Sequence, residues 1–405
     1  MQLLPKLVVI LAWAALLAGL TLPTPTPEIA NIATLVLMGL GLLVLAFVPS
    51  ARAVLRQPAI TMALGAGLVL LAALAFTATS ALHILVILTL APLWLAGAHA
   101  GLLTRLGAQL TPRLIGSFAL AGAAAGAGIA AFDVLVRQLE RGGFLVNNPI
   151  HLADLALMLG FVALVGVLER RPWRWLFLLG PLLGLIAVWF SGSRGPLLAF
   201  VPMLIVAAAV LGYLTLSRRR MLLATTAVIV LLALIGAGVI GFGLGGRLGR
   251  LGGDVVALFT GSTTDGAIGE RLYMYLSAWN ALLASPWYGY GMIDFTTSAA
   301  QFAPPGPGYP PSSHLHNDIA DFAVIGGMLG LLSYVLLLVA PLAGGLGTRG
   351  RNRPAAIYLG AVAGVGYFSM GLTNAMFGIL TQTVVYGVIL ALIAALARLG
   401  QGEQA

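Results

Sequence analysis

Apolar runs that are long enough to cross a membrane recur along most of the chain. Each run has about 17 to 23 residues, and a helix of about 20 apolar residues spans the hydrocarbon core of a bilayer. The pattern predicts about twelve transmembrane helices, at residues 6–22, 29–48, 59–79, 81–102, 114–132, 151–168, 174–190, 195–216, 221–243, 319–340, 355–373 and 376–396. The sequence therefore indicates an all-α polytopic membrane protein.

One long polar stretch interrupts this pattern between the ninth and tenth predicted helices. It divides the chain into residues 1–243 with nine transmembrane helices, a loop region at 244–318, and residues 319–405 with three helices and a tail. Within the loop, the spacing of apolar residues predicts a helix from Ile268 to Ala284, which Pro286 and the glycines after it end. The loop region is thus expected to carry short helices of its own.

The composition agrees with this fold class and narrows the chemistry. Hydrophobic residues make up 60% of the chain and charged residues 8%, and cysteine is absent, which excludes disulfides and thiol nucleophiles. The sequence contains no Gly-rich phosphate loop followed by Lys-Ser/Thr, no Gly-x-Ser-x-Gly turn and no Asp-x-Asp pair. We therefore expect no bound metal and no cofactor.

The basic residues predict how the chain is oriented. Alternating the predicted helices across the membrane puts 15 of the 21 lysines and arginines on one side and 6 on the other. Positive loops stay in the cytoplasm, so both termini are expected there and the long loop on the opposite, periplasmic face. The net charge of +9 thus reflects membrane orientation, and no nucleic-acid partner is expected because no soluble basic surface with interleaved aromatics is present.

Arg194 lies in a very short connection on the predicted outer face. Gly192 and Gly195 permit a tight reversal, and Pro196 suits the first turn of the next helix. A guanidinium fixed there binds a phosphate or carboxylate, or else extends to lipid headgroups. Basic residues are disfavoured on the outer face, so the position of Arg194 there favours a role in binding an anion. Two further arginines of this face, Arg137 and Arg141, are candidates by topology alone.

The predicted loop helix places Arg271, Tyr275 and Trp279 on one face at a spacing of four residues. This face suits a cradle for a sugar diphosphate. The same aromatic residues also suit a belt that lies on the membrane surface.

The segment from Ser312 to Asp318 contains two histidines just before the tenth predicted helix. If it is extended, the rings of His314 and His316 lie on opposite sides, and Asn317 or Asp318 caps the helix. Asp318 or Asp321 lies within reach of His316 to orient it. One imidazole is expected to act as a base. A metal site is the main alternative, but it needs three or four ligands, and His151 is the one plausible remote addition.

The order of these parts resembles the bacterial O-antigen ligase family of the O-antigen ligase and Wzy polymerase superfamily. The similarity rests on Ser191-Gly-Ser-Arg194-Gly, on Glu270-Arg271 with Trp279, on Ser285-Pro-Trp-Tyr-Gly-Tyr-Gly291, and on His314-Leu-His316-Asn-Asp opening a Gly-containing helix. It covers roughly residues 185–335 in detail and the whole chain in the number of spans.

The resemblance implies a GT-C-type, metal-independent, inverting glycosyltransferase with a periplasmic active site in the bacterial inner membrane. Its donor would be an O-antigen linked to undecaprenyl diphosphate and its acceptor a sugar hydroxyl of lipid A–core. By resemblance Arg194 and Arg271 hold the diphosphate and His316 is the base. His314 is a candidate substrate-binding residue and the alternative candidate for the base. The short connection from Asp133 to Ile150 favours a ligase over a Wzy-type polymerase, and a protein O-oligosaccharyltransferase is a further alternative.

A transporter or flippase for lipid-linked sugars is the alternative of another class. Transporters place charged groups near the bilayer midplane and contain paired repeats. Here the polar groups cluster at one predicted edge, and no internal repeat is evident. The sequence does not indicate an oligomeric state.

Overall fold

The computed structural model describes residues 3–169, 171–220, 222–223, 226, 266–305, 309 and 312–401. Within these ranges the regular structure is helical and no β-strand occurs. The α-helices are α1 (Leu3–Leu16), α2 (Pro27–Phe47), α3 (Pro58–Thr77), α4 (Ala81–Leu85), α5 (Ala91–Trp94), α6 (Ala96–Leu103), α7 (Pro112–Leu135), α8 (Pro149–Ala163), α9 (Leu179–Ser191), α10 (Arg194–Thr215), α13 (Gly266–Ala284), α14 (Phe295–Ala300), α15 (Asp318–Gly347), α16 (Arg353–Gly371) and α17 (Leu380–Gln401).

Short helices of other types extend or connect several of these elements. A π-helical turn, η1 (Leu17–Thr21), continues α1, and the remaining six are 3-10 helices. These are η2 (Pro49–Arg56), η3 (Val86–Leu90), η4 (Thr104–Gln109), η5 (Leu164–Leu168), η6 (Pro172–Leu178) and η7 (Gly350–Asn352).

The structure confirms the fold class. Ten continuous helical stretches of the described chain are long and apolar enough to span a membrane, and the shorter apolar helix Lys6–Thr21 accompanies them. Together they correspond to eleven of the twelve predicted spans. The predicted span 221–243 lies almost entirely outside the described residues, as do Arg247 and Arg250.

Prolines set the beginnings of many of these helices. Pro27, Pro58, Pro112 and Pro149 each occupy the first helical position, where the missing N–H would have no partner in the helix. The side chains of Thr111 and Asn148 cap two of them by accepting from the backbone N–H of Leu114 and Ile150 respectively. Proline and capping residues therefore mark where these helices begin, as they do in soluble proteins.

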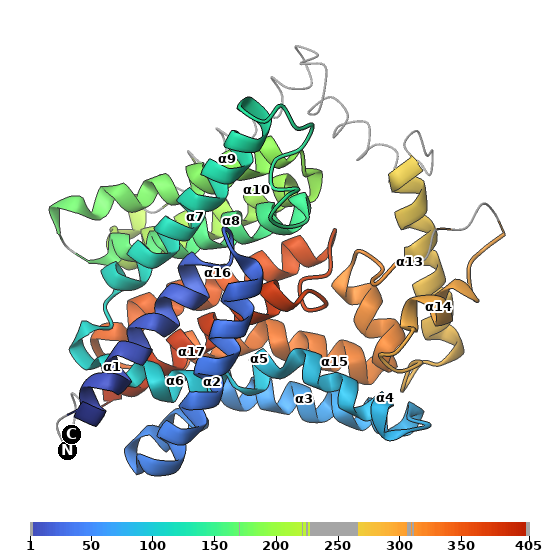
Figure 1. Ribbon diagram of the computed structural model, residues 1–405, viewed down its shortest axis with the longest axis horizontal. Helices are drawn as coiled ribbons and strands as arrows, with labels where there is room; N and C mark the ends of the chain where they lie inside the picture. The colour runs from blue at the N-terminus through green and yellow to red at the C-terminus, as the bar shows by residue number, and fades with distance from the viewer. Residues whose placement is uncertain are drawn as a thin grey trace.

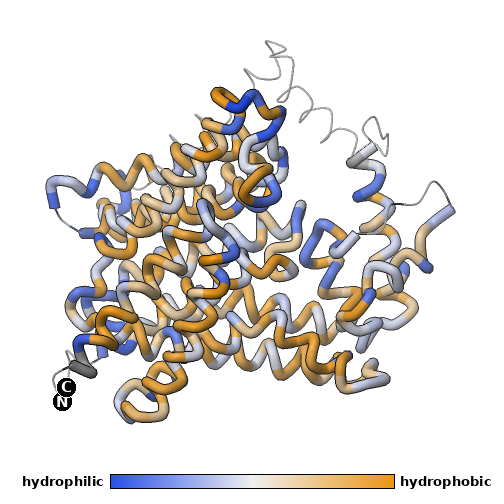
Figure 2. Tube along the Cα trace, in the orientation of Figure 1, coloured by the Kyte–Doolittle hydropathy of each residue, from blue (hydrophilic) through white to orange (hydrophobic). Residues whose placement is uncertain are grey.

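Two helices form the centre of the bundle. In their most apolar windows, 89% of residues are buried in the span Pro149–Leu168 and 94% in Leu380–Gln401, compared with 22% in Arg194–Thr215. Figure 2 shows apolar residues along the helices and hydrophilic residues gathered in the connections. The outward apolar faces suit contact with lipid chains, which are as apolar as the side chains themselves.

Helix α15 is broken near its beginning, and the break holds the loop region. Gly327 has φ +58° and ψ −140°, outside the helical range. Around it, the backbone N–H groups of Tyr290 and Gly291 donate to the carbonyls of Val324 and Ile325, and the N–H of Met328 donates to the carbonyl of Pro286 at 2.7 Å. The break leaves backbone groups of α15 without partners inside the helix. The segment after α13 supplies these partners, as buried irregular backbone requires.

A small core of its own joins the loop helices to the beginning of α15. Its buried members come from α13, α14 and the residues around the start of α15, and they are Met274, Ala278, Ala281, Ala299, Leu315, Ala320 and Val324. In Figure 1, α13 and α14 lie at the end of the molecule away from α1 and the marked termini. The predicted loop helix Ile268–Ala284 is confirmed as the greater part of α13.

Candidate active site

The two histidines lie side by side just before α15. Their ring centroids are 4.3 Å apart and the rings meet edge to face. The expectation that the rings lie on opposite sides is wrong, because His316 has φ +54° instead of an extended conformation. This turn also lets the backbone N–H of His316 donate to Nδ1 of His314 at 3.3 Å, which requires an unprotonated Nδ1. The chain thus forms a compact histidine corner, residues 314–317.

Three polar side chains fix this corner. Asn317 Oδ1 caps α15 by accepting from the N–H groups of Ile319 at 2.9 Å and Ala320 at 3.4 Å. Asp321 Oδ1 accepts from the N–H of Leu315 at 2.7 Å. Asp318 Oδ1 accepts from the N–H groups of Met376 and Phe377 in the α16–α17 connection.

The carboxylates of Asp318 and Asp321 therefore accept hydrogen bonds from backbone N–H groups. The expectation that one of them orients the His316 ring is wrong. Asp318 and Asp321 are both buried, and Asp318 is directed toward the α16–α17 connection. Among the residues that the structure describes, Nδ1 of His316 has no hydrogen-bond partner. Within the described part of the chain, the His316 ring is thus positioned by the backbone turn and by edge-to-face contact with His314, and no carboxylate bonds it.

Helix α13 brings Arg271 and Tyr275 to the histidine corner. The Tyr275 hydroxyl is within 3.2 Å of the His316 carbonyl and 3.4 Å of the Leu372 carbonyl, to which it donates. Burial lowers the pKa of His314, and the positive charge of Arg271 lowers it further. Within the described residues, Arg271 has no ion-pair partner, Glu270 included. Its positive charge acts on both imidazoles and lowers their pKa values.

Both imidazoles are held neutral at physiological pH. Burial lowers the pKa of His316 to about 4, with further contributions from His314, Arg271 and His151. His151 lies in the first turn of α8, so the fold brings a third histidine into electrostatic range of the corner. In the described part of the chain, no group of three or more His, Cys, Asp or Glu side chains is arranged to hold a metal ion.

The Arg194 turn is built by a separate set of hydrogen bonds. Gly192 has φ +66° and ends α9, and Arg194 begins α10 two residues later. Arg141 donates from Nε to the carbonyl of Ser191 at 2.8 Å and from Nη2 to Ser193 Oγ at 3.3 Å. Arg141, a predicted substrate-binding residue, thus uses its guanidinium to hold the turn before Arg194.

The α16–α17 connection, residues 372–379, attaches this turn to the histidine corner. Gly195 packs so closely on Thr373 that an added Cβ would overlap Oγ1 of Thr373. The neighbouring Leu372 carbonyl accepts from Asn317 Nδ2 at 3.3 Å and from the Tyr275 hydroxyl. Segments around residues 194, 275 and 317 thus meet at two consecutive residues, 372 and 373.

Two other predicted site residues lie apart from these contacts. Arg137 forms an ion pair with Asp133 at 3.0 Å, and its guanidinium lies 5.1 Å from the centre of the Phe132 ring. Arg137 and Asp133 line a cavity of about 520 Å³ together with Pro25 and Val146. Trp279 is 58% exposed on α13, two turns beyond Arg271. Their predicted roles in substrate binding stay predictions.

Sequence reasoning missed the contribution of the α16–α17 connection. Residues 372–377 supply carbonyl and N–H partners to Tyr275, Asn317 and Asp318, although their side chains are mostly apolar. Almost every residue type supplies such backbone groups, so the sequence does not reveal them. A signal in the sequence was the polar pair Thr373-Asn374 between two apolar runs, and Asn374 Nδ2 donates to Asp154 at 2.7 Å.

Comparison with known families bears on this same region. Residues 179–335 match the O-antigen ligase family. The matching stretch begins at α9 and ends within α15, so it contains the Arg194 turn, α13 and the histidine corner. No curated protein matches the chain. The match supports a function of the O-antigen ligase type, within a superfamily that also contains the Wzy polymerases.

Proposed function

We propose that the protein is a membrane glycosyltransferase that transfers a glycan from undecaprenyl diphosphate to a sugar hydroxyl of lipid A–core. The observation that carries the proposal is the cluster of Arg271, Tyr275, His314 and His316, formed inside the stretch that matches the O-antigen ligase family. A neutral imidazole accepts a proton, and guanidinium groups stabilise the negative charge of a departing diphosphate. These are the two requirements of glycosyl transfer from a lipid diphosphate.

In the proposed reaction, the acceptor hydroxyl attacks the anomeric carbon of the donor sugar. The bond from that carbon to the diphosphate oxygen breaks, and the diphosphate leaves with the electron pair. His316 takes the hydroxyl proton, and Arg194 and Arg271 bind the diphosphate. The configuration at the anomeric carbon inverts because attack and departure occur on opposite faces of the sugar.

The electrostatics of the site suggest an order of binding. Arg271 contributes to the low pKa of His316, so an anion that neutralises this guanidinium raises the basicity of the imidazole. A bound donor diphosphate would supply that anion. We infer that His316 becomes an effective base once the donor is in place, which limits transfer to the complex that holds both substrates.

The orientation in the membrane follows from the charge distribution. We propose that both termini lie in the cytoplasm and that the histidine corner lies at the periplasmic face of the inner membrane. The excess of basic residues in one set of connections supports this assignment. The lipid-linked donor would then reach the site from the outer leaflet.

Reconstitution with a lipid-linked glycan and lipid A–core tests the proposal, with products identified by mass. The expected product is the glycan joined to lipid A–core, and His316→Ala should abolish its formation. His83→Ala is the matched control, because the His83 imidazole bonds the Ser80 and Thr79 hydroxyls and takes no part in the hydrogen bonds described for the histidine corner. Unchanged transfer by His316→Ala would remove the proposed base.

The same assay separates the alternatives. Elongation of the lipid-linked glycan without transfer to lipid A–core would identify a polymerase, and a glycosylated protein would identify a protein O-oligosaccharyltransferase. Movement of the donor across vesicles without a covalent product would identify a transporter. Loss of activity with EDTA, restored by a divalent ion, would contradict the metal-independent mechanism.

A further inference from the structure

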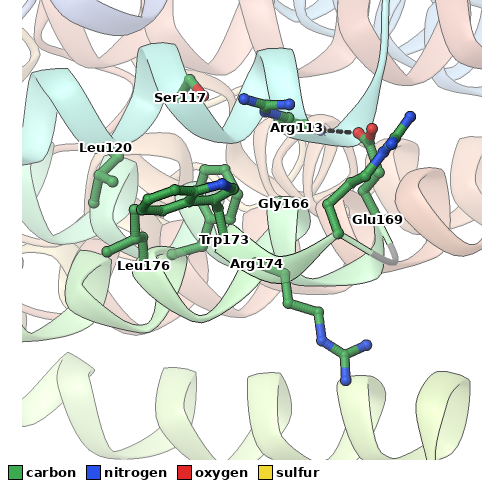
Figure 3. A pocket seen from close by; sticks show the side chains of 10 residues that line it. Arg113, Ser117, Leu120, Gly166, Glu169, Trp173, Arg174 and Leu176 are labelled. Carbon is green, nitrogen blue, oxygen red and sulfur yellow. Dashed lines mark hydrogen bonds between the residues drawn. The ribbon is translucent and has the colours of Figure 1, made fainter.

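Another cavity lies between the beginning of α7 and η6. It has a volume of about 270 Å³, and its lining includes Arg113, Ser117, Glu169, Arg171 and Trp173. Figure 3 shows the Trp173 indole between Leu120 and Leu176 on one side of the cavity, and Arg113 and Glu169 on the other. The cavity therefore has one apolar wall and one charged wall.

The charged wall has an excess of positive charge. Three arginines line the cavity, Arg113, Arg171 and Arg174, together with a single carboxylate, Glu169. Glu169 Oε2 accepts from the backbone N–H of Arg113 at 3.1 Å, so this carboxylate is engaged by the main chain. In Figure 3 the Arg174 side chain extends away from Trp173, and it stacks on Trp175 with its guanidinium 4.4 Å from the ring centre. Arg113 and Arg171 are thus the guanidiniums best placed for an anion.

The cavity lies at the opposite end of the bundle from the Arg194 turn. Helix α7 has 24 residues, so it is about 36 Å long. Its first turn carries Arg113, whereas Asp133 near its last turn accepts from the N–H of Gly143, close to the arginine that holds the Arg194 turn. This length matches the thickness of a bilayer. The cavity and the histidine corner therefore face different membrane surfaces.

The surroundings of the cavity indicate a membrane interface. Trp173 is 67% exposed and Trp175 57%, and tryptophan is enriched at the depth of lipid headgroups. Leu176 and Leu178 beside them are also exposed. Phosphate groups are the abundant anions at that depth, and arginine binds phosphate through two parallel N–H groups. The combination of two guanidinium-bearing residues with an apolar wall fits a headgroup attached to acyl chains.

We propose that this cavity binds the phosphate group of an anionic phospholipid, with Arg113 and Arg171 as its cationic partners and Trp173 against the glycerol or acyl region. Ser117, which also lines the cavity, adds a hydroxyl donor. Such a lipid would connect the beginning of α7 to η6 at the surface away from the site of glycosyl transfer.

Native mass spectrometry of the full-length protein in a neutral detergent tests the proposal. After removal of bound lipid, phosphatidylglycerol and phosphatidylcholine with the same acyl chains are offered at equal concentration. Phosphatidylglycerol should be retained preferentially, and the double variant Arg113→Gln/Arg171→Gln should lower its retention about tenfold. Arg218→Gln/Arg219→Gln is the matched control, because it removes the same charge from two exposed arginines outside the cavity lining.

Glu169→Gln gives a result in the opposite direction. Glutamine keeps an oxygen that accepts from the Arg113 N–H and removes the negative charge from the cavity wall, so retention of phosphatidylglycerol should rise. Equal retention of the two lipids, or equal loss in the control variant, would refute the proposal. Displacement of phosphatidylglycerol by millimolar inorganic phosphate would overturn the lipid assignment in favour of a soluble phosphate.

Discussion

Replacement of Gly327 by alanine tests whether the break in α15 holds the loop region in place. A Cβ at this position would lie 2.7 Å from the Pro286 carbonyl oxygen and 2.7 Å from the carbonyl carbon of Trp287. Both atoms are backbone, so neither moves away as a flexible side chain would. The backbone angles of Gly327 are also ones that residues with a Cβ rarely adopt.

The expected loss of stability in Gly327→Ala has two contributions. A non-glycine residue in a sparsely populated backbone region costs about 1–3 kcal/mol. Displacement of the Pro286 carbonyl also removes the acceptor of the Met328 N–H, and a backbone donor left without a partner and away from water costs about 1–3 kcal/mol. Together they predict a loss of about 2–6 kcal/mol of stability. This is a large part of the stability of an ordinary domain.

Thermal unfolding in detergent, followed by tryptophan fluorescence, measures the effect. Gly65→Ala in α3 is the matched control, because an added Cβ there meets nothing within 4 Å, and it should leave the midpoint unchanged or raise it slightly. Gly327→Ala should lower the midpoint and the rate of glycan transfer together. Equal stability of the two variants would show that the break in α15 is not required.

Three further predictions concern the site itself. Asn317→Ala should lower stability by about 1 kcal/mol because the cap of α15 is lost; Asn317→Asp keeps the cap, and calorimetry of the two variants should differ accordingly. The pKa of His316 is about 4 in the folded protein, below the ordinary 6.5, so the unfolded chain binds the proton first and stability should fall as the pH is lowered from about 6.5 to about 4. His316→Gln should flatten this fall in unfolding midpoints measured across that window, and an unchanged pH dependence would contradict the assignment. Arg141→Gln removes two hydrogen bonds from the turn before Arg194 and should slow transfer about tenfold, whereas Arg137→Gln should slow it less; equal rates for both variants would argue against a positioning role.

The long apolar runs were sufficient to predict the fold class and eleven of the twelve spans, because lipid and the protein interior both favour apolar side chains. The boundaries differ where the apolar pattern continues through irregular backbone. The last span was predicted to begin at 376, yet Met376 and Phe377 are buried in a connection, and α17 begins at Leu380. The run of apolar residues hides a turn whose N–H groups bind Asp318.

In the candidate site, too, features set by side-chain type were predictable and features set by the backbone were not. Residue types identified the two histidines and limited the cap of α15 to Asn317 or Asp318, of which the structure shows Asn317. The contact between the two imidazoles was not predictable, because it arises from the φ of +54° at His316, which the sequence does not encode in an obvious residue such as glycine. The carbonyl of Leu372 was equally hidden, because any residue type supplies it.

The dependence of the site on residues 372–377 has a consequence for biosynthesis. Ribosomes release a chain from its amino end, so the arginines and histidines of the site enter the membrane before the hairpin of α16 and α17 does. Until that hairpin inserts, Asn317 and Tyr275 lack their shared acceptor, and Asp318 lacks the two N–H groups that bind it. An incompletely inserted protein would therefore carry the candidate site residues without the backbone groups that align them. The proposed transfer would then begin only after the last helix is in place.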